Sequence, residues 1–123
     1  MAASQLRDIV FDCADQRRVA HFWAEVLGYS LRPEPPDAAP DEPMVIVPPQ
    51  GNLRIWFNQV PEPKISKNRV HIDINMLDDG EMERLLRLGA RVLREIHQED
   101  GTLAWTIMAD PEGNEFCAFP LRR

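Results

Sequence analysis

Two stretches of the chain alternate between apolar and other side chains with a period of two. The first covers residues 6–13 and the second residues 70–76, and their alternating apolar positions are Ile9, Phe11, Cys13, Ile72, Ile74 and Met76. Successive side chains of a β-strand point to opposite faces, so this period predicts two strands with unlike faces. Shorter apolar stretches predict further strands at 29–32, 44–47, 53–59, 90–95, 103–108 and 115–119.

A helical pattern follows each alternating stretch. After Asp15, which is a favourable N-cap, apolar residues recur at the spacing of one helix face: Val19, Phe22, Trp23, Val26 and Leu27. Gly28 then supplies the left-handed residue that ends many helices. A second helix is predicted from Asp79 as N-cap to Gly89 as stop, with an apolar face made of Met82, Leu85 and Leu86.

Proline and glycine mark the connections between these elements. Seven of the eleven prolines lie between Pro33 and Pro49. Proline lacks the backbone donor that helices and central strands need, so the segment 33–43 is predicted to be a surface loop, with a domain linker as the alternative. A turn that ends at Gly101 is predicted to join two strands, and Gly113 is expected to give a second turn its positive φ.

The two halves of the sequence repeat the same order of elements. Residues 8–15 align with 71–78 at an offset of 63, the Leu-Gly pair at 27–28 aligns with 88–89 at an offset of 61, and 49–52 aligns with 111–114 at an offset of 62. Three landmarks in one order at nearly one offset indicate an internal duplication, and a chance likeness of two strand–helix segments is the alternative. A repeat with only two copies argues against a solenoid.

Composition narrows the class of protein. A chain of 123 residues suits one domain, and its formal net charge of −6 argues against binding to nucleic acid or to an anionic membrane. No apolar run reaches the ~20 residues of a membrane span, and no signal-peptide pattern is found at the N-terminus. Two cysteines without a CxxC motif suit a reducing compartment, so a cytoplasmic location is expected.

The order of elements and several local motifs resemble the vicinal-oxygen-chelate superfamily, which includes glyoxalases, bleomycin-resistance proteins and extradiol dioxygenases. The resemblance covers nearly the whole chain. It rests on an opening motif within 12–29, a connector motif within 60–73 and the closing motif MADPEGNEFC at 108–117. These motifs are similar to the glyoxalase-like branch of the superfamily.

The resemblance implies an α+β fold of two tandem βαβββ modules, whose strands form a curved, mostly antiparallel sheet around a cavity with the helices outside. It also implies a single glyoxalase-like domain over residues 1–123, with module one at about 5–60, a connector at 61–67 and module two at about 68–120. Members of the superfamily usually pair, so a homodimer is expected.

In metal-using relatives, the ligands come from the first and last strands of each half. The matching positions here are Asp8, Ile55, His71 and Cys117, where relatives carry histidine or glutamine, glutamate, histidine and glutamate. Isoleucine cannot bind a metal, and a set of carboxylate, imidazole and thiolate suits zinc better than iron, nickel or magnesium. The usual metal site is therefore disfavoured, with Asp8, His71 and Cys117 as vestigial positions, and the cofactor stays unknown.

His71 is the strongest catalytic candidate. It stands at a ligand position of the relatives and shares a strand face with Asp73 and Asn75. A histidine beside a carboxylate in a cavity can serve as a general base, so His71, Asp73 and, if the last strand keeps the same phase, Glu115 are candidate catalytic residues. Hydrogen bonding within the sheet, without a ligand, is the alternative.

Acidic and aromatic side chains are the other candidates for binding a ligand. Acidic groups around a concave site favour a cationic or hydrogen-bond-donating ligand, and aromatic surfaces hold flat or cationic molecules. The candidate ligand-binding residues are Asp8, Asp12, Ile55, Trp56, Phe57, Asn75, Trp105 and Cys117.

The sequence does not determine which face of the strand at 53–59 points to the cavity. Trp56 and Phe57 are adjacent, so only one of them can face the cavity. The ligand position at Ile55 favours Phe57, although Arg54 would then face the helices. A slip of the alignment would instead bring an amide side chain of 58–59 into the ligand position.

Two classes of function follow from these observations. The first is a protein that binds a small organic molecule, such as an antibiotic or an aromatic metabolite, in a cavity without metal, and the isoleucine at a ligand position supports it. The second is a lyase, isomerase or dioxygenase that uses a divalent metal or His71 as a base, and a dimer module without ligand is a third alternative. The basic connector residues Lys64, Lys67 and Arg69 either bind an anion or lie in solvent.

Overall fold

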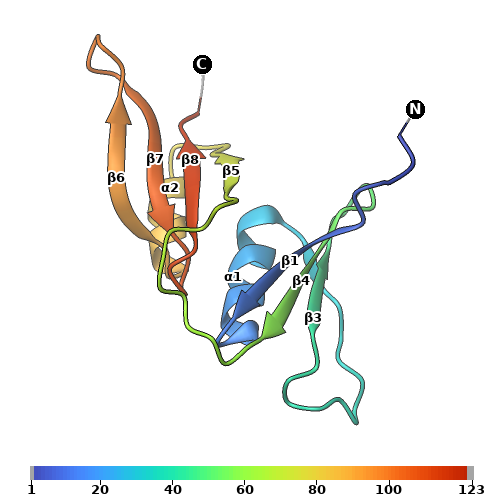
Figure 1. The fold of residues 1–123 in the computed structure, drawn as a ribbon. Helices are drawn as coiled ribbons and strands as arrows, with labels where there is room; N and C mark the ends of the chain where they lie inside the picture. Colours follow the sequence, from blue (N-terminus) through green and yellow to red (C-terminus); the bar gives the residue numbers. More distant parts are fainter. Residues whose placement is uncertain (1, 122–123) are drawn as a thin grey trace. The chain divides into compact units, whose positions relative to one another are not determined.

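The chain folds into two compact units that divide between Pro63 and Lys64 (Figure 1). The computed structural model describes residues 2–121. Within that range, each unit contains a four-stranded mixed sheet and one helix. The strand order is β1-β4-β3-β2 in the first unit and β5-β8-β7-β6 in the second, so the pairing pattern repeats. This architecture confirms the predicted α+β fold of two tandem modules.

Each unit follows the order strand, helix, strand, strand, strand. The elements of the first unit are β1 (Asp8–Cys13), α1 (Gln16–Leu27), β2 (Ser30–Leu31), β3 (Met44–Val47) and β4 (Arg54–Gln59). Those of the second unit are β5 (Ile72–Asn75), α2 (Glu81–Arg87), β6 (Arg91–His97), β7 (Leu103–Ala109) and β8 (Glu115–Phe119). The first strand of each unit pairs in parallel with the last, and the other pairs are antiparallel.

The helix α1 has the caps and the buried face that its sequence predicts. The side chain of Asp15 accepts a hydrogen bond from the backbone N–H of Arg18 at 3.2 Å, which satisfies one of the free donors of the first turn. Gly28 ends the helix in the left-handed region with φ 69°. Phe22 and Trp23 are 3% and 1% exposed, so this part of the predicted apolar face is buried.

The helix α2 is shorter, and its predicted cap is wrong by one residue. Its N-cap is Gly80 rather than Asp79, and no side chain caps it. The carboxylate of Asp78 instead accepts a hydrogen bond from the N–H of Gly80 at 2.9 Å, which closes the turn before the helix. Leu85 is fully buried while Leu86 is 44% exposed, so the apolar face is narrower than predicted. In the described part of the chain, no helix has the length and apolarity to cross a membrane.

Each sheet packs one face into a core of its own unit. In the first unit, the ring of Phe11 lies 5.8 Å from that of Trp23 and 5.4 Å from that of Phe57. In the second unit, the buried apolar side chains include Ile74, Leu85, Met108, Phe116 and Ala118. Removing a large apolar side chain from water contributes ~1.5–3 kcal/mol, so these residues fix which face of each strand turns inward.

The core of the first unit contradicts the preferred phase of β4. Ile55 and Phe57 are 3% and 0% exposed, so they pack inward, and the alternate residues Arg54, Trp56 and Asn58 lie on the open face. The prediction that Ile55 and Phe57 face a ligand is therefore wrong. The physical reason is that burying an aliphatic and an aromatic side chain stabilises the fold, and this burial fixes which face of β4 turns inward. The alignment of the two halves did not take this burial into account.

One extra residue explains the error in that match. The strand β8 begins directly after Asn114, whereas Leu53 intervenes between the equivalent asparagine and β4. Cys117 lies three residues after Asn114, and the same count from Asn52 gives Ile55 because it includes the extra Leu53. By the strand registers, the residue of β4 that corresponds to Cys117 of β8 is Trp56 and not Ile55.

Candidate functional site

The open face of the second sheet carries a pocket of about 290 Å³. Its lining side chains are Lys67, His71, Asp73, Trp105, Ile107, Glu115, Cys117 and Phe119. Alternate residues of β7 and β8 supply most of this lining, because their neighbours in sequence point into the core. Five residues that the sequence singled out thus meet in one pocket: His71, Asp73, Trp105, Glu115 and Cys117.

One wall of the pocket is aromatic and apolar. The rings of Trp105 and Phe119 lie 5.7 Å apart with an interplanar angle of 32°, and Ile107 follows Trp105 on the same face of β7. Aromatic faces at this tilt present a broad surface against which a flat molecule can pack.

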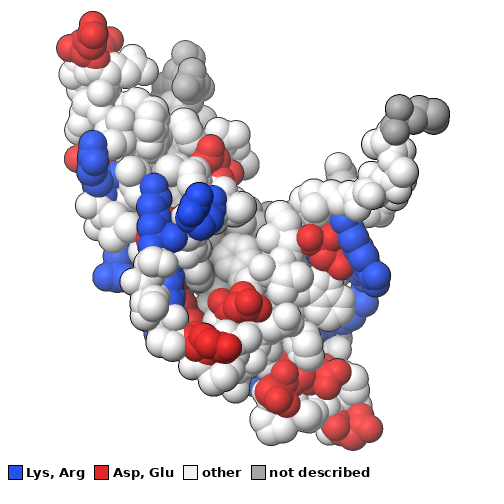
Figure 2. Space-filling view, viewed as in Figure 1, with Lys and Arg blue, Asp and Glu red and all other residues white. Residues whose placement is uncertain are grey.

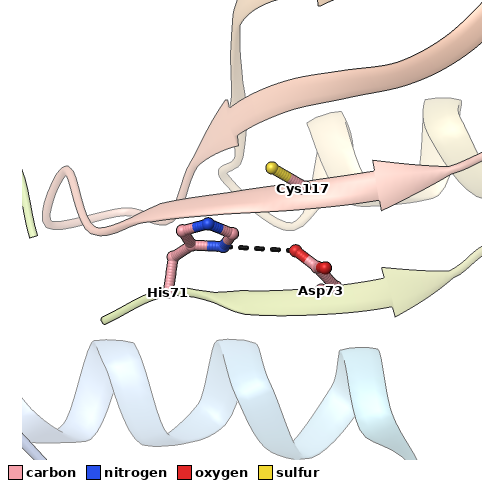
Figure 3. A group of neighbouring side chains, drawn as sticks. All are labelled: His71, Asp73 and Cys117. Carbon is pink, nitrogen blue, oxygen red and sulfur yellow. Dashed lines mark ion pairs between the residues drawn. The ribbon is translucent and has the colours of Figure 1, made fainter. Parts of the chain in front are cut away.

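The polar rim of the pocket contains a histidine–carboxylate pair. His71 Nδ1 lies 3.2 Å from Asp73 Oδ1, and Figure 3 shows the ring and the carboxylate turned toward one another. The two side chains are 41% and 54% exposed, so a bound molecule can reach them. Cys117 on β8 is the register partner of Asp73, which brings the thiol beside the pair.

The thiol of Cys117 is held in its protonated form. Burial raises the pKa of Cys117, and the negative charge of Asp73 and a hydrogen bond with its carboxylate raise it further, against a smaller opposing effect of Lys67. Cysteine is a nucleophile as the thiolate, so this environment makes Cys117 a hydrogen-bond donor rather than an activated nucleophile.

Glu115 is tied to the connector before β5. Its carboxylate accepts hydrogen bonds from Lys64 Nζ at 3.1 Å and from the backbone N–H of Asn68 at 3.0 Å. Burial alone would raise the pKa of Glu115, but the hydrogen bonds from Asn68 and Lys64 and the charge of Lys64 together lower it. Glu115 is therefore ionised and already paired, which suits a structural role at the pocket edge better than proton transfer.

A rigid turn sets the start of β8. The carboxylate of Asp110, which is fully buried, accepts hydrogen bonds from the backbone N–H groups of Glu112 and Asn114 at 2.9 and 3.0 Å. It also accepts one from Asn114 Nδ2 at 2.9 Å, and Gly113 supplies the predicted positive φ of 88°. The motif at 110–114 thus works as a turn that positions Glu115 and Cys117.

The remaining predicted site residues do not line this pocket. Asp8 lies on the open face of β1, with its carboxylate oxygens 3.4 Å from both Arg7 Nε and Arg54 Nε. The guanidinium of Arg54 stands 5.7 Å from the ring centre of Trp56. Asp12 is exposed in the first unit, and an exposed asparagine ends β5 at Asn75.

The ligand set expected from metal-using relatives does not fit this chain. Asp8 is paired with two arginines, and the indole of Trp56 stands where a carboxylate would be needed. Within the second unit, one ligand atom each of His71, Asp73 and Cys117 lies within 4.8 Å of the others. Imidazole, carboxylate and thiolate are all ligands of zinc, so these three are the residues within 2–121 that could hold a metal.

Three lining residues were not predicted as ligand-binding residues. Ile107 and Phe119 lie two residues beyond Trp105 and Cys117, so the period of two could have found them. Lys67 is one of the connector residues expected either to bind an anion or to lie in solvent, and its place at the rim depends on how that segment folds back, which no local pattern encodes.

Residues 8–119 match the family described as Glyoxalase-like domain, and the chain therefore belongs to this family. The match confirms the resemblance to the glyoxalase/bleomycin-resistance/dioxygenase superfamily. No curated protein matches the chain.

Solved structures share the fold at low sequence identity. A glyoxalase-related enzyme from Fulvimarina pelagi is 19% identical, with a TM-score of 0.63 over 95% of this chain and 88% of that one. The E126Q mutant of the fosfomycin resistance protein FosX from Listeria monocytogenes, complexed with Mn(II) and 1S,2S-dihydroxypropylphosphonic acid, is 15% identical, with a TM-score of 0.71 over 96% and 90%.

A third similar structure is the antibiotic binding protein TnmS3 from Streptomyces sp. CB03234. It is 19% identical, with a TM-score of 0.63 over 99% of both chains. At these identities the likeness shows the fold alone.

Proposed function

We propose that this protein binds a small organic molecule in the pocket of the second sheet and does so without the usual metal. The observation that carries this proposal is the pocket itself, in which an aromatic wall faces a polar rim. A mostly apolar hollow with a few convergent polar groups is the usual form of a small-molecule site.

The chemistry of the lining limits the ligand. The flat part of the molecule packs against Trp105 and Phe119, and a donor or cationic group meets Asp73 at the rim. A volume of about 290 Å³ lies at the small end of ligand pockets, which favours a compact molecule. Neighbours that include a fosfomycin resistance protein and an antibiotic binding protein support a small organic molecule as the ligand.

The proposal includes a cytoplasmic homodimer. Pairing is the usual state in the superfamily that the motifs resemble, and the two described cysteines form no disulfide, which suits a reducing compartment. Sedimentation equilibrium tests the pairing, since a dimer has twice the 14.1 kDa mass of one chain.

A thermal-shift screen tests ligand binding. Flat cationic aromatics and α-keto thiol adducts are the two probe sets, because a molecule that binds only the folded state raises the melting temperature. For any hit, Trp105→Ala is expected to weaken binding by about tenfold, which corresponds to ~1.4 kcal/mol, and Trp105→Phe to restore part of it.

The matched control is His97→Ala, an exposed β6 residue outside the pocket lining. It is expected to bind the hit like the unmodified protein. Binding that survives Trp105→Ala unchanged would place the ligand elsewhere and overturn the proposed site.

A second candidate function is a metal-dependent or His71-base lyase, isomerase or dioxygenase. It is favoured by the approach of His71, Asp73 and Cys117 to within 4.8 Å. Elemental analysis of protein purified without chelator is the test. Stoichiometric metal that disappears in His71→Ala but persists in His97→Ala would replace the metal-free proposal with this one. If the unmodified protein and His97→Ala are both purified without metal, the metal-dependent form is excluded.

A further inference from the structure

The open face of the first sheet carries a hollow of about 400 Å³ that two arginines border. Its lining residues are Arg32, Val47, Pro48, Gly51, Asn52 and Arg54. Arg54 is the first residue of β4, and its side chain is held over the ring of Trp56 at 5.7 Å. The backbone N–H of Arg32 donates to the carbonyl of Val45 at 3.1 Å, which holds Arg32 beside β3.

Both guanidinium groups have unused hydrogen-bond donors. Among the described residues, the side chains of Arg32 and Arg54 donate no hydrogen bond, and Arg32 has no carboxylate partner. Arg54 lies 3.4 Å from Asp8 Oδ1, yet that buried oxygen accepts no hydrogen bond in the described part of the chain. The contact compensates charge without occupying the guanidinium donors.

The local charge is opposite in sign to that of the whole chain. Among the described residues, Arg32 and Arg54 line the hollow with two positive charges, and the adjoining Asp8 offsets one of them, which gives 2 − 1 = +1 on a chain of net charge −6. Basic and acidic side chains adjoin one another in Figure 2 where β1 and β4 lie in Figure 1. A concave surface with excess positive charge concentrates anions from solution.

Neighbouring acids form no ion pair with Arg32 in the described part of the chain. Arg32 also borders a smaller hollow of about 170 Å³, whose acidic residues are Glu34 and Glu42. The carboxylate of Glu34 is already bound by Arg17, with contacts of 2.8 and 3.2 Å. Arg32 is thus bordered by one compensated acid and by Glu42, and neither forms an ion pair with it.

We propose that Arg32 and Arg54 form a binding site for the oxyanion group, carboxylate or phosphoryl, of a small molecule. Guanidinium presents its donors in a planar fork that matches two oxygens of such a group. Val47 and Pro48 provide an apolar wall for the organic part next to the charge. This site uses residues of the first unit only and goes beyond the function proposed for the second.

Titration with inorganic phosphate and with acetate at constant ionic strength tests the proposal. Binding is followed by isothermal calorimetry and by tryptophan fluorescence, because an anion bound by Arg54 changes the charge next to the Trp56 ring. Saturable binding of at least one anion is expected. Tighter binding of phosphate identifies a phosphoryl group as the ligand group, and tighter binding of acetate identifies a carboxylate. Constant ionic strength is needed because salt screens exposed charges.

Arg32→Gln is expected to weaken that binding about tenfold or more, and Arg32→Lys to restore only part of it, since lysine keeps the charge but not the fork. Arg94→Gln makes the same change of charge at an exposed residue of β6 and is expected to bind like the unmodified protein. Equal losses in the Arg32 and Arg94 variants would show general charge attraction and overturn the site. So would the lack of saturable binding of either anion.

Arg54→Gln is the second variant. Its melting temperature is measured alongside, because it also removes a partner of Asp8. Loss of binding in a folded variant is expected. Full binding in either the Arg54 or the Arg32 variant contradicts a site that needs both arginines.

Discussion

At the scale of single residues, Cys117 is the position at which the second-unit pocket departs from the ligand set of metal-using relatives. This position carries glutamate in the relatives that the motifs resemble. Burial and the adjacent carboxylate of Asp73 raise the pKa of the thiol here, so it keeps its proton at neutral pH. A neutral donor beside the His71–Asp73 pair suits hydrogen bonding to a ligand.

The first prediction concerns the reactivity of this thiol. Cys117 is expected to react with iodoacetamide more slowly than an unperturbed cysteine near pH 8, because little thiolate is present. Asp73→Asn removes the negative charge and is expected to shift the pH profile of the reaction to lower pH. Mass spectrometry of the peptide that contains Cys117 measures the rate, with the buried Cys13 as an unreactive internal reference.

The same shift has a defined effect on stability. Because the pKa is raised in the folded state, the protonated thiol contributes stability that is fully present below the pKa of the unfolded thiol, ~8.5. That contribution is lost as the pH rises from there through the folded pKa. An alkylation profile that is identical in the unmodified protein and the Asp73 variant would contradict the assigned cause.

The sequence identified His71 and Asp73 of the second-unit pocket because the segment at 70–76 differs clearly between its two faces. His71 and Asp73 alternate with isoleucines, so one phase is polar and the other apolar. In β4 both phases contain an aromatic ring, Trp56 in one and Phe57 in the other. Only the packing of the core distinguishes them, and packing is not visible in the order of residues.

At the scale of elements, the turn at 110–114 is the feature that positions the pocket. The buried carboxylate of Asp110 satisfies three donors of the turn, so β8 begins at a fixed point. The sequence predicted the turn and its glycine, because Gly113 follows proline and an acidic residue. It did not reveal that Asp110 would be buried, since that depends on how the turn closes against the sheet.

The second prediction is that Asp110→Ala destabilises the protein by about 3 kcal/mol, because buried donors lose a charged acceptor. Asp100→Ala is the matched control. Asp100 accepts hydrogen bonds from Thr102 in the exposed turn between β6 and β7, and its loss is expected to cost clearly less. Urea unfolding measures both variants, and equal destabilisation would contradict the role given to Asp110.

The helix α2 shows why element ends are harder to predict than the elements themselves. The run Asp78-Asp79-Gly80 offers consecutive residues that favour a helix start. The chain uses Asp78 to close a turn and starts the helix after Gly80. Local hydrogen bonds of similar strength compete here, and the pattern of apolar residues does not choose between them.

At the scale of the whole molecule, the duplication gives each unit its own sheet, helix and buried aromatic residues. Phe57 is fully buried in the first unit and Phe116 in the second. The repeated order of elements was predictable because hydrophobic period, caps and turns recur at one offset. The chemistry was not, because function depends on the open faces, where the two halves differ most.

The third prediction follows from the two separate cores. Phe57→Ala and Phe116→Ala are each expected to cost ~3–5 kcal/mol. Amide hydrogen exchange is expected to accelerate mainly within residues up to Pro63 for the first variant and mainly from Lys64 onward for the second. The two variants serve as controls for each other, and equal acceleration throughout the chain in both would show a single cooperative unit.

Leu53, which lies between the turn and the last strand of the first unit and has no counterpart in the second, shows how such a duplicate can diverge. The pairing of β4 with β1 holds the strand in place, so the loop takes up the additional residue and no side chain changes face. Insertions and deletions in the hairpin tips are therefore tolerated while the sheet stays intact. Each copy can therefore change the binding residues on the open face of its sheet while its buried core stays the same.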